Sequence, residues 1–220
     1  VLINVGGVDK SRVDTDEGIS GWGEAYNHGP DEALFPVFEY MFAQIMGEDP
    51  RRVEHLTQKI TRLARFPQGA IGLAALSAID HALWEISAIA LNVPVYQLLG
   101  GRVRDRVPVY CGLYTAPDAE VARDQTAELN ETYGLTAFKL SPWRVDIHAQ
   151  RWGLVVSQIA DYFGEVRAAA DPRWDFAFDA HAQVFEPYRA IELGNALAPY
   201  QPMFFEEPMR PEHIPSWQHV

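Results

Sequence analysis

Apolar runs in the second half of the sequence end in side chains that can carry out chemistry. The segment FAFDAHAQVF (176–185) runs into Asp179 and, two residues later, His181. Positions i and i+2 of an extended chain face the same side, so both groups should point to one place. The segments FKLS and FFEEP end in the same way, with Lys139 and Glu206. Charged groups at such positions are not needed for packing and are costly to bury unpaired, so we predict a functional site.

Two carboxylates in this set come from neighbouring predicted strands. If Asp179 and Glu206 converge on one point, their oxygens suit a hard divalent cation, and Mg²⁺ prefers such ligands. The alternative is that each carboxylate only caps a helix or pairs with a basic side chain. Polar residues at the ends of three consecutive strands weigh against that alternative.

The elements that must position these residues alternate along the second half of the chain. We expect strands at 107–114, 136–141, 175–182 and 202–208, and helices at 117–134, 146–164 (ending at Gly164) and 186–200, with a fourth helix near Pro211. This alternation predicts parallel βα units, of which four are half of an eight-fold barrel. An open doubly wound sheet is the alternative, although no Gly-rich phosphate loop follows the first strand. In a βα barrel the C-terminal strand ends build the active site.

The first half of the sequence has a different order of predicted strands and helices. It reads as strand, turn and strand over residues 1–26, followed by helices at 30–47, 50–64 and 72–92 and a short helix at 95–101. The third helix is nearly apolar on all sides, so we expect it to be buried. The charged segment RVRDR (102–106) marks the expected boundary between domains at 1–104 and 105–220.

Composition limits the class of partner. The 18 basic and 30 acidic residues give a formal charge of −12, which disfavours binding to nucleic acid or to an anionic membrane. A single cysteine, Cys111, excludes an intrachain disulfide framework. No signal peptide or span of about 20 apolar residues is evident, so we expect a cytoplasmic protein. The sequence begins inside an apolar run without Met, and we expect the natural N-terminus to precede it.

Several motifs together resemble one family. GWGEAY, AALSAIDHALWEISAIALNVPVYQLLGG, FKLS, FDAHA and FFEEP occur in the order seen in the mandelate racemase and muconate lactonizing branch of the enolase superfamily. The resemblance runs over essentially the whole chain. It implies an α+β capping domain on a (β/α)7β TIM-type barrel, of which this chain would hold the first four βα units. It also implies a Mg²⁺ ion that stabilises the enediolate formed when a base removes the proton next to a carboxylate.

The resemblance assigns roles to the strand-end residues. Asp179 and Glu206 match the family's first and second metal ligands, and the third is expected beyond residue 220, so we expect the chain to be a fragment. A Lys-x-Lys motif is common on the second strand, but here it reads Lys139-Leu140-Ser141. Ser141 cannot act as the base unaided, so the base is expected from a His–Asp dyad on later strands. Lys139 is expected to pair with the substrate carboxylate, the alternative being a lysine whose ammonium lies in solvent.

His181 distinguishes this sequence from most of the family. In the subgroup similar to galactonate and mannonate dehydratases, an Asp-x-His at this strand end supplies a general acid for the departing β-hydroxyl. Hydroxide is a poor leaving group, so protonation by a group that titrates near neutrality is required. The sequence therefore predicts a dehydratase of an aldonate such as galactonate, mannonate or gluconate, with a 2-keto-3-deoxy acid as product. The alternatives are a racemase, epimerase or cycloisomerase on the same scaffold, or a non-catalytic binding or regulatory relative.

Further residues are candidates for substrate binding. Trp143 and Arg144 follow the second strand, and Glu24 and His28 belong to the capping domain, whose loops set specificity in this family. The alternatives are a structural role for Glu24 and a solvated loop for His28. Relatives are commonly dimers or larger rings, so we expect a homo-oligomer that acts on a small carboxylate.

Overall fold

The computed structural model of the chain describes residues 2–5, 8–25, 31–65, 68–113, 116, 118–141, 147–212, 214–218 and 220. The chain forms two compact units, Val1–Asp105 and Arg106–Val220. Each unit has its own core of buried apolar side chains. We describe the units separately.

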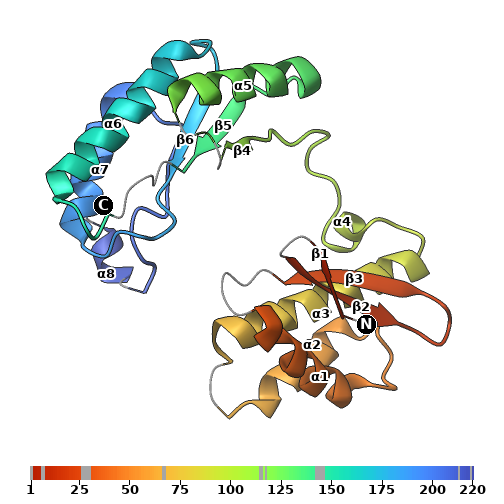
Figure 1. Cartoon of the computed structure of the whole chain (residues 1–220). Coiled ribbons are helices and arrows are strands. Elements are labelled where there is room, and N and C mark those ends of the chain that lie inside the picture. Colours follow the sequence, from red (N-terminus) through yellow and green to blue (C-terminus); the bar gives the residue numbers. More distant parts are fainter. Residues whose placement is uncertain are drawn as a thin grey trace. The chain divides into compact units, whose positions relative to one another are not determined.

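The first unit combines an antiparallel sheet with helices (Figure 1). Its strands lie in the order β1 (Leu2–Val5), β2 (Val8–Asp14) and β3 (Ser20–Ala25). Its helices are the 3-10 helix η1 (Asp31–Ala33), α1 (Leu34–Ile45), α2 (Val53–Leu63), α3 (Gly69–Ala90) and α4 (Val95–Leu98).

The central strand β2 has no counterpart in the sequence prediction, which placed only two strands before the first helix. The buried side of this strand carries a polar residue, Ser11, which obscures the apolar alternation expected of a half-buried strand. The Ser11 hydroxyl is fully buried and donates a hydrogen bond to the carbonyl oxygen of Ala78 in α3 at 3.2 Å. The acceptor that satisfies this buried hydroxyl, the Ala78 carbonyl, is 67 residues away in the sequence, so the local pattern could not reveal it.

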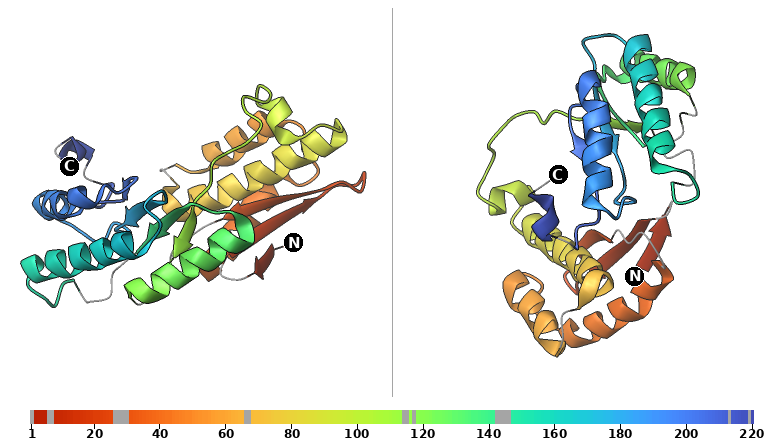
Figure 2. Two further views of the ribbon diagram at one scale, coloured as in Figure 1. Left: turned by 90° about the horizontal axis from the view of Figure 1, so that it is seen from above. Right: turned by 90° about the vertical axis from the view of Figure 1, so that its left-hand side faces the viewer.

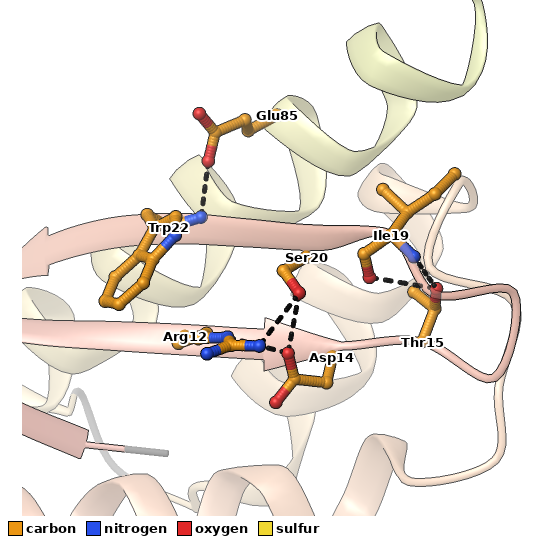
Figure 3. Close-up of polar contacts among 7 residues, drawn as sticks. All are labelled: Arg12, Asp14, Thr15, Ile19, Ser20, Trp22 and Glu85. Atoms are coloured by element: carbon orange, nitrogen blue, oxygen red, sulfur yellow. Dashed lines mark hydrogen bonds and ion pairs between the residues drawn. The ribbon is translucent and has the colours of Figure 1, made fainter.

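Helix α3 lies directly against the backbone of β3. A Cβ atom added at Gly21 would lie 2.1 Å from the carbonyl oxygen of Ala82, and one at Gly23 would lie 1.7 Å from that of Ala78. The two glycines of GWGEAY therefore permit this packing. Between them, the backbone N–H of Trp22 donates a hydrogen bond to the Glu85 carboxylate at 2.5 Å (Figure 3). Helix α3 is long and apolar enough to cross a membrane, but it is the core helix of this unit and contacts β2, β3, α1 and α2.

The open face of this sheet carries a polar network at the β2–β3 hairpin (Figure 3). The Arg12 guanidinium pairs with the Asp14 carboxylate at 2.7 Å, and the Ser20 hydroxyl donates to the same carboxylate at 2.7 Å. Arg12 also lies over the ring of Trp22, which is 41% exposed. These contacts join the two strands of the hairpin next to its turn.

The second unit is a parallel sheet with helices. The strands lie in the order β4 (Cys111–Leu113), β5 (Ala137–Leu140), β6 (Asp175–Asp179) and β7 (Phe205–Glu206). The helices are α5 (Ala119–Tyr133), α6 (Trp152–Ala169), α7 (Pro187–Leu197), the 3-10 helix η2 (Ala198–Tyr200) and α8 (Ile214–Trp217). Helices α5, α6 and α7 lie side by side along the sheet (Figures 1 and 2). The predicted parallel βα alternation is confirmed, with strands shorter than expected.

Strand alternation separates an apolar face of this sheet from a face that carries charged side chains. Phe138, Leu140, Phe176 and Phe178 are fully or almost fully buried in the core shared with α5 and α6. The residues between them in the strands point to the opposite face because side chains alternate along a strand. Lys139 and Asp179 are on this opposite face.

Both predicted bounds of helix α6, 146 and 164, are wrong, since the helix begins at Trp152. Helix α6 was expected to end at Gly164 but continues to Ala169. A Cβ atom at Gly164 would lie 2.7 Å from the ring of Tyr200, so this glycine makes room for a neighbouring aromatic side chain. By contrast, α5 ends at Gly134, as predicted, and this glycine adopts a left-handed conformation with φ of 70°.

Candidate functional site

The polar strand ends of the second unit meet at one edge of the sheet. Asp179 on β6 and Glu206 on β7 are paired in register, and Lys139 on β5 lies opposite Ala177 on β6. The Lys139 Nζ lies 2.9 Å from Asp179 Oδ2 and 2.8 Å from Glu206 Oε2. The parallel register therefore brings two carboxylates and one ammonium together from three strands, although their residues are up to 67 positions apart in the sequence.

This ion cluster is largely shielded from water. The side chains of Lys139 and Asp179 are 8% and 3% exposed, and that of Glu206 is 34% exposed. Ala177, which lies opposite Lys139 on the neighbouring strand β6, has a small side chain and is fully buried. The ammonium also lies 5.4 Å from the ring centroid of Tyr110, within the range of a cation–π interaction. The predicted alternative for Lys139, a lysine with its ammonium in solvent, is wrong.

His181 is bound to the same cluster through Asp179. Its Nε2 lies 3.1 Å from Asp179 Oδ2, and its backbone N–H donates to Asp179 Oδ1 at 2.9 Å. Both carboxylate oxygens of Asp179 are thus engaged by His181 or by Lys139. The imidazole is 36% exposed, so it has access to a ligand as well as to Asp179.

Ser141 contacts the other nitrogen of the imidazole. The Ser141 Oγ lies 3.0 Å from His181 Nδ1, within hydrogen-bond distance. Two contacts on opposite sides of the ring therefore fix its orientation. The sequence prediction assigned Ser141 no function of its own. Its position two residues after Lys139, on the same side of an extended strand, was the available signal.

The turn after β6 has an unusual backbone conformation. His181 and Ala182 have φ values of 48° and 50°, in the left-handed region that side chains with a Cβ disfavour. The Asp179 carboxylate holds the N–H of His181, and the N–H of Ala182 donates to the carbonyl oxygen of Glu207 at 3.1 Å. These two hydrogen bonds maintain a turn that directs the imidazole back to Asp179.

The residues of this cluster fit a divalent metal ion. A single cation, the Lys139 ammonium, reaches the carboxylates of both Asp179 and Glu206, so their oxygens converge on one cation position. Carboxylate oxygens are the ligands that Mg²⁺ prefers, and Mg²⁺ commonly uses one or two of them together with water or substrate oxygens. Within the described part of the chain, no group of three or more potential ligand side chains gathers. The fit therefore rests on two carboxylates.

The remaining predicted site residues are not part of this cluster. Glu24 is exposed on β3 in the first unit. Within the described side chains it has no hydrogen-bond or ion-pair partner, and its contact with substrate stays a prediction. Three further candidates lie outside the described residues: His28, Trp143 and Arg144.

A cavity of about 500 Å³ lies in the first unit and is lined only by residues of that unit. Apolar side chains such as Phe42 and Leu83 line it, together with the acidic residues Asp16, Glu48 and Asp49. Glu48 and Asp49 are paired with Lys59 and with Arg51, respectively. The lining contains no histidine or lysine, and Glu48 and Asp49 already pair with basic side chains, so the strand-end cluster is the stronger candidate site.

Both halves of the chain match known domain families. Residues 10–100 match the N-terminal domain of mandelate racemase / muconate lactonizing enzyme, and residues 121–220 match the enolase C-terminal domain-like family. Among curated relatives, D-galactonate dehydratases from Variovorax paradoxus and Ralstonia nicotianae are 38% and 34% identical over 217 and 209 residues. The matches cover 93% and 94% of this chain and 53% of each relative. The chain thus spans about half the length of the curated relatives it matches.

Solved structures of enolase-type enzymes are also similar to this chain. An enolase from Agrobacterium radiobacter, a candidate galactarate dehydratase crystallised with sodium and L-malate, is 57% identical with a TM-score of 0.89. The match covers 96% of this chain and 54% of that one. The 3,6-anhydro-D-galactonate cycloisomerase from Zobellia galactanivorans is 26% identical with a TM-score of 0.82, over 96% of this chain and 56% of that one.

Proposed function

The chain belongs to the mandelate racemase and muconate lactonizing enzyme family of the enolase superfamily, and from this membership we propose that it carries part of the active site of a Mg²⁺-dependent sugar-acid dehydratase. The reaction would remove the proton next to the substrate carboxylate and eliminate the β-hydroxyl, giving a 2-keto-3-deoxy acid. The first unit would be the capping domain, and the second would be the first half of a (β/α)7β barrel. We propose a cytoplasmic homo-oligomer as the working form.

The observation that carries this proposal is the position of His181. Its imidazole lies 3.1 Å from the Asp179 carboxylate, is held by Ser141 on the other side, and remains partly exposed. A protonated imidazole in this position can donate a proton to a departing hydroxyl group, which leaves poorly as hydroxide. An enzyme that only racemises or epimerises its substrate has no leaving hydroxyl to protonate.

Asp179 and Glu206 would hold the metal, whose charge stabilises the dianion that forms on proton removal. Lys139 would bind the substrate carboxylate through its ammonium group. A protonated His181 would then transfer a proton to the β-hydroxyl as the carbon–oxygen bond breaks, so that the hydroxyl leaves as water. Within the described residues we assign no base for the first proton transfer, because Ser141 is not basic enough and contacts His181 instead.

The relatives support this class of substrate. Curated relatives at 31–38% identity are D-galactonate dehydratases, and the Agrobacterium radiobacter protein is a candidate galactarate dehydratase with a bound dicarboxylate. We therefore propose a six-carbon sugar acid as substrate. The similar cycloisomerase from Zobellia galactanivorans favours a second candidate function, the intramolecular rearrangement of an anhydro sugar acid.

A screen of sugar acids tests the proposal. Full-length protein with Mg²⁺ would be incubated with aldonates, including galactonate, mannonate and gluconate, and with aldarates such as galactarate, and 2-keto-acid formation would be measured. We expect at least one substrate to form a 2-keto-3-deoxy acid, and to do so only with the metal present. Turnover without loss of water would favour the isomerase alternative. Binding of a sugar acid without any turnover would favour a non-catalytic relative.

A further inference from the structure

Lys139 lies at the position where the two carboxylates of the site can hold a cation. Its Nζ is within 2.9 Å of both Asp179 and Glu206, and its side chain is buried. We infer that Lys139 is the counter-ion of this carboxylate pair in the metal-free protein and that a divalent ion must displace it. On this inference, which rests on the proposed metal site, Lys139 lowers the intrinsic metal affinity of the site.

The electrostatic argument has two parts. Without metal, the buried carboxylate of Asp179 needs a nearby positive charge, and Lys139 supplies it. With metal, the ammonium and the ion would require the same oxygens, Asp179 Oδ2 and Glu206 Oε2. Like charges only a few ångströms apart repel strongly in a shielded site. The two cations therefore exclude each other from this position.

The surroundings offer the displaced ammonium another position. The ring of Tyr110 already lies 5.4 Å from Nζ and is 44% exposed. The face of an aromatic ring stabilises a cation. Metal binding would thus convert Lys139 from a partner of the protein's own carboxylates into a group that can pair with an incoming anion.

This arrangement couples the binding of metal to the binding of an anionic ligand. A carboxylate ligand that pairs with the displaced ammonium stabilises the metal-loaded state, so it should increase the metal affinity. By linkage, the metal increases the affinity for the carboxylate by the same factor. Lys139 would therefore suppress metal binding in the absence of ligand and favour it in the presence of ligand.

Measured Mg²⁺ affinity tests the inference without any assay of turnover. Isothermal titration of full-length protein with Mg²⁺ alone would compare the wild type with Lys139→Met, which removes the charge, and with Lys139→Arg, which keeps it. We expect Lys139→Met to bind Mg²⁺ on the order of tenfold more tightly, because a unit positive charge near a divalent ion is removed. We expect Lys139→Arg to bind no more tightly than the wild type.

A matched control removes a lysine elsewhere. Lys59→Met, in the first unit, breaks an ion pair of 2.7 Å with Glu48 and changes the net charge by the same amount. It should leave the Mg²⁺ affinity unchanged. A Lys139→Met variant that binds Mg²⁺ as weakly as the wild type, or more weakly, overturns the inference, because a purely structural lysine would behave in that way.

Thermal unfolding gives a second readout. Without metal, Lys139→Met should unfold at a lower temperature than the wild type, and Mg²⁺ should raise its unfolding temperature more than that of the wild type. If this variant folds only with Mg²⁺, its affinity can be measured by competition with a chelator. An equal effect of Mg²⁺ on both proteins contradicts the inference. Tighter binding by the variant together with a negative sugar-acid screen would support this inference and reject the dehydratase.

Discussion

The Oγ of Ser141 lies 3.0 Å from Nδ1 of His181, across 40 residues of sequence. Ser141 occupies the strand position at which many relatives of this family are expected to carry a lysine base. In this protein the residue instead contacts the proposed general acid, whose other nitrogen contacts Asp179. The strand end that lacks the usual base therefore helps to orient an acid.

Ser141→Ala should weaken this orientation. Loss of one hydrogen bond worth about 0.5–1.5 kcal/mol should lower kcat for dehydration by roughly two- to tenfold, with Mg²⁺ affinity unchanged. Steady-state kinetics on the substrate found by the screen would measure the effect. Ser157→Ala, at an exposed position of α6, is the control. Full activity in Ser141→Ala would show that the serine does not position the imidazole.

His181→Asn should separate proton donation from metal binding. We expect dehydration to fall by roughly 10²–10⁴-fold, the usual effect of losing an acid catalyst, while Mg²⁺ still binds to Asp179 and Glu206. Kinetics and titration calorimetry on the same preparation would measure both quantities. His55→Asn, on the exposed side of α2, should leave both the dehydration rate and Mg²⁺ binding unchanged. Near-normal dehydration by His181→Asn would contradict the proposed role of this histidine as the general acid.

Gly23→Ala should destabilise the first unit. The added Cβ would lie 1.7 Å from the carbonyl oxygen of Ala78, so β3 and α3 would have to separate. We expect a loss of at least about 2–3 kcal/mol in the free energy of unfolding, measured by denaturant titration. Gly153→Ala provides a contrast, because no atom lies within 4 Å of its added Cβ and the position is exposed in α6. That variant should be neutral or slightly stabilised, and equal effects of the two would contradict the packing argument.

The tripeptide Asp-Pro-Arg occurs once in each unit with the same geometry. The Arg173 side chain and backbone N–H donate to Asp171, and those of Arg51 donate to Asp49. The side-chain hydrogen bond from the arginine, followed by the backbone hydrogen bond, lowers the pKa of each aspartate from 3.8 to about 2. Arg173→Ala should raise the pKa of Asp171 towards 3.8, whereas that of Asp49 should not change.

The direction of the pH effect follows from the lowered pKa. A carboxyl group with a lower pKa in the folded state stabilises the fold fully above its unfolded value, near 3.8, and this contribution is lost as the pH falls through about 2. Titration of the carboxyl ¹³C shifts by NMR would measure both aspartates in one experiment. Because both turns are at the surface, we expect only a small change in stability. An Asp171 that titrates near 3.8 in the wild type would refute the turn geometry.

Much of the second unit was predictable from the sequence for a physical reason. Alternation along a strand decides which side chains share a face, so Phe176 and Phe178 are buried while Asp179 lies on the opposite side. Parallel βα units align their strand ends, which was sufficient to predict that Asp179 and Glu206 would be neighbours. The left-handed Gly134 at the end of α5 was predictable because glycine adopts that conformation at low cost.

Only the tertiary structure decided which groups are in contact. The alternation along each strand places Lys139 and Ser141 on one face, but it does not specify that Lys139 reaches both carboxylates or that Ser141 contacts His181, because it fixes the face of a residue and not its partner on another strand. The role of a glycine is equally difficult to predict from the sequence. Gly164 was expected to end a helix, yet it makes room for the ring of Tyr200. Gly23 instead allows the backbone of β3 to approach α3. Close contacts between distant segments depend on packing, and local sequence patterns carry no information about distances between them.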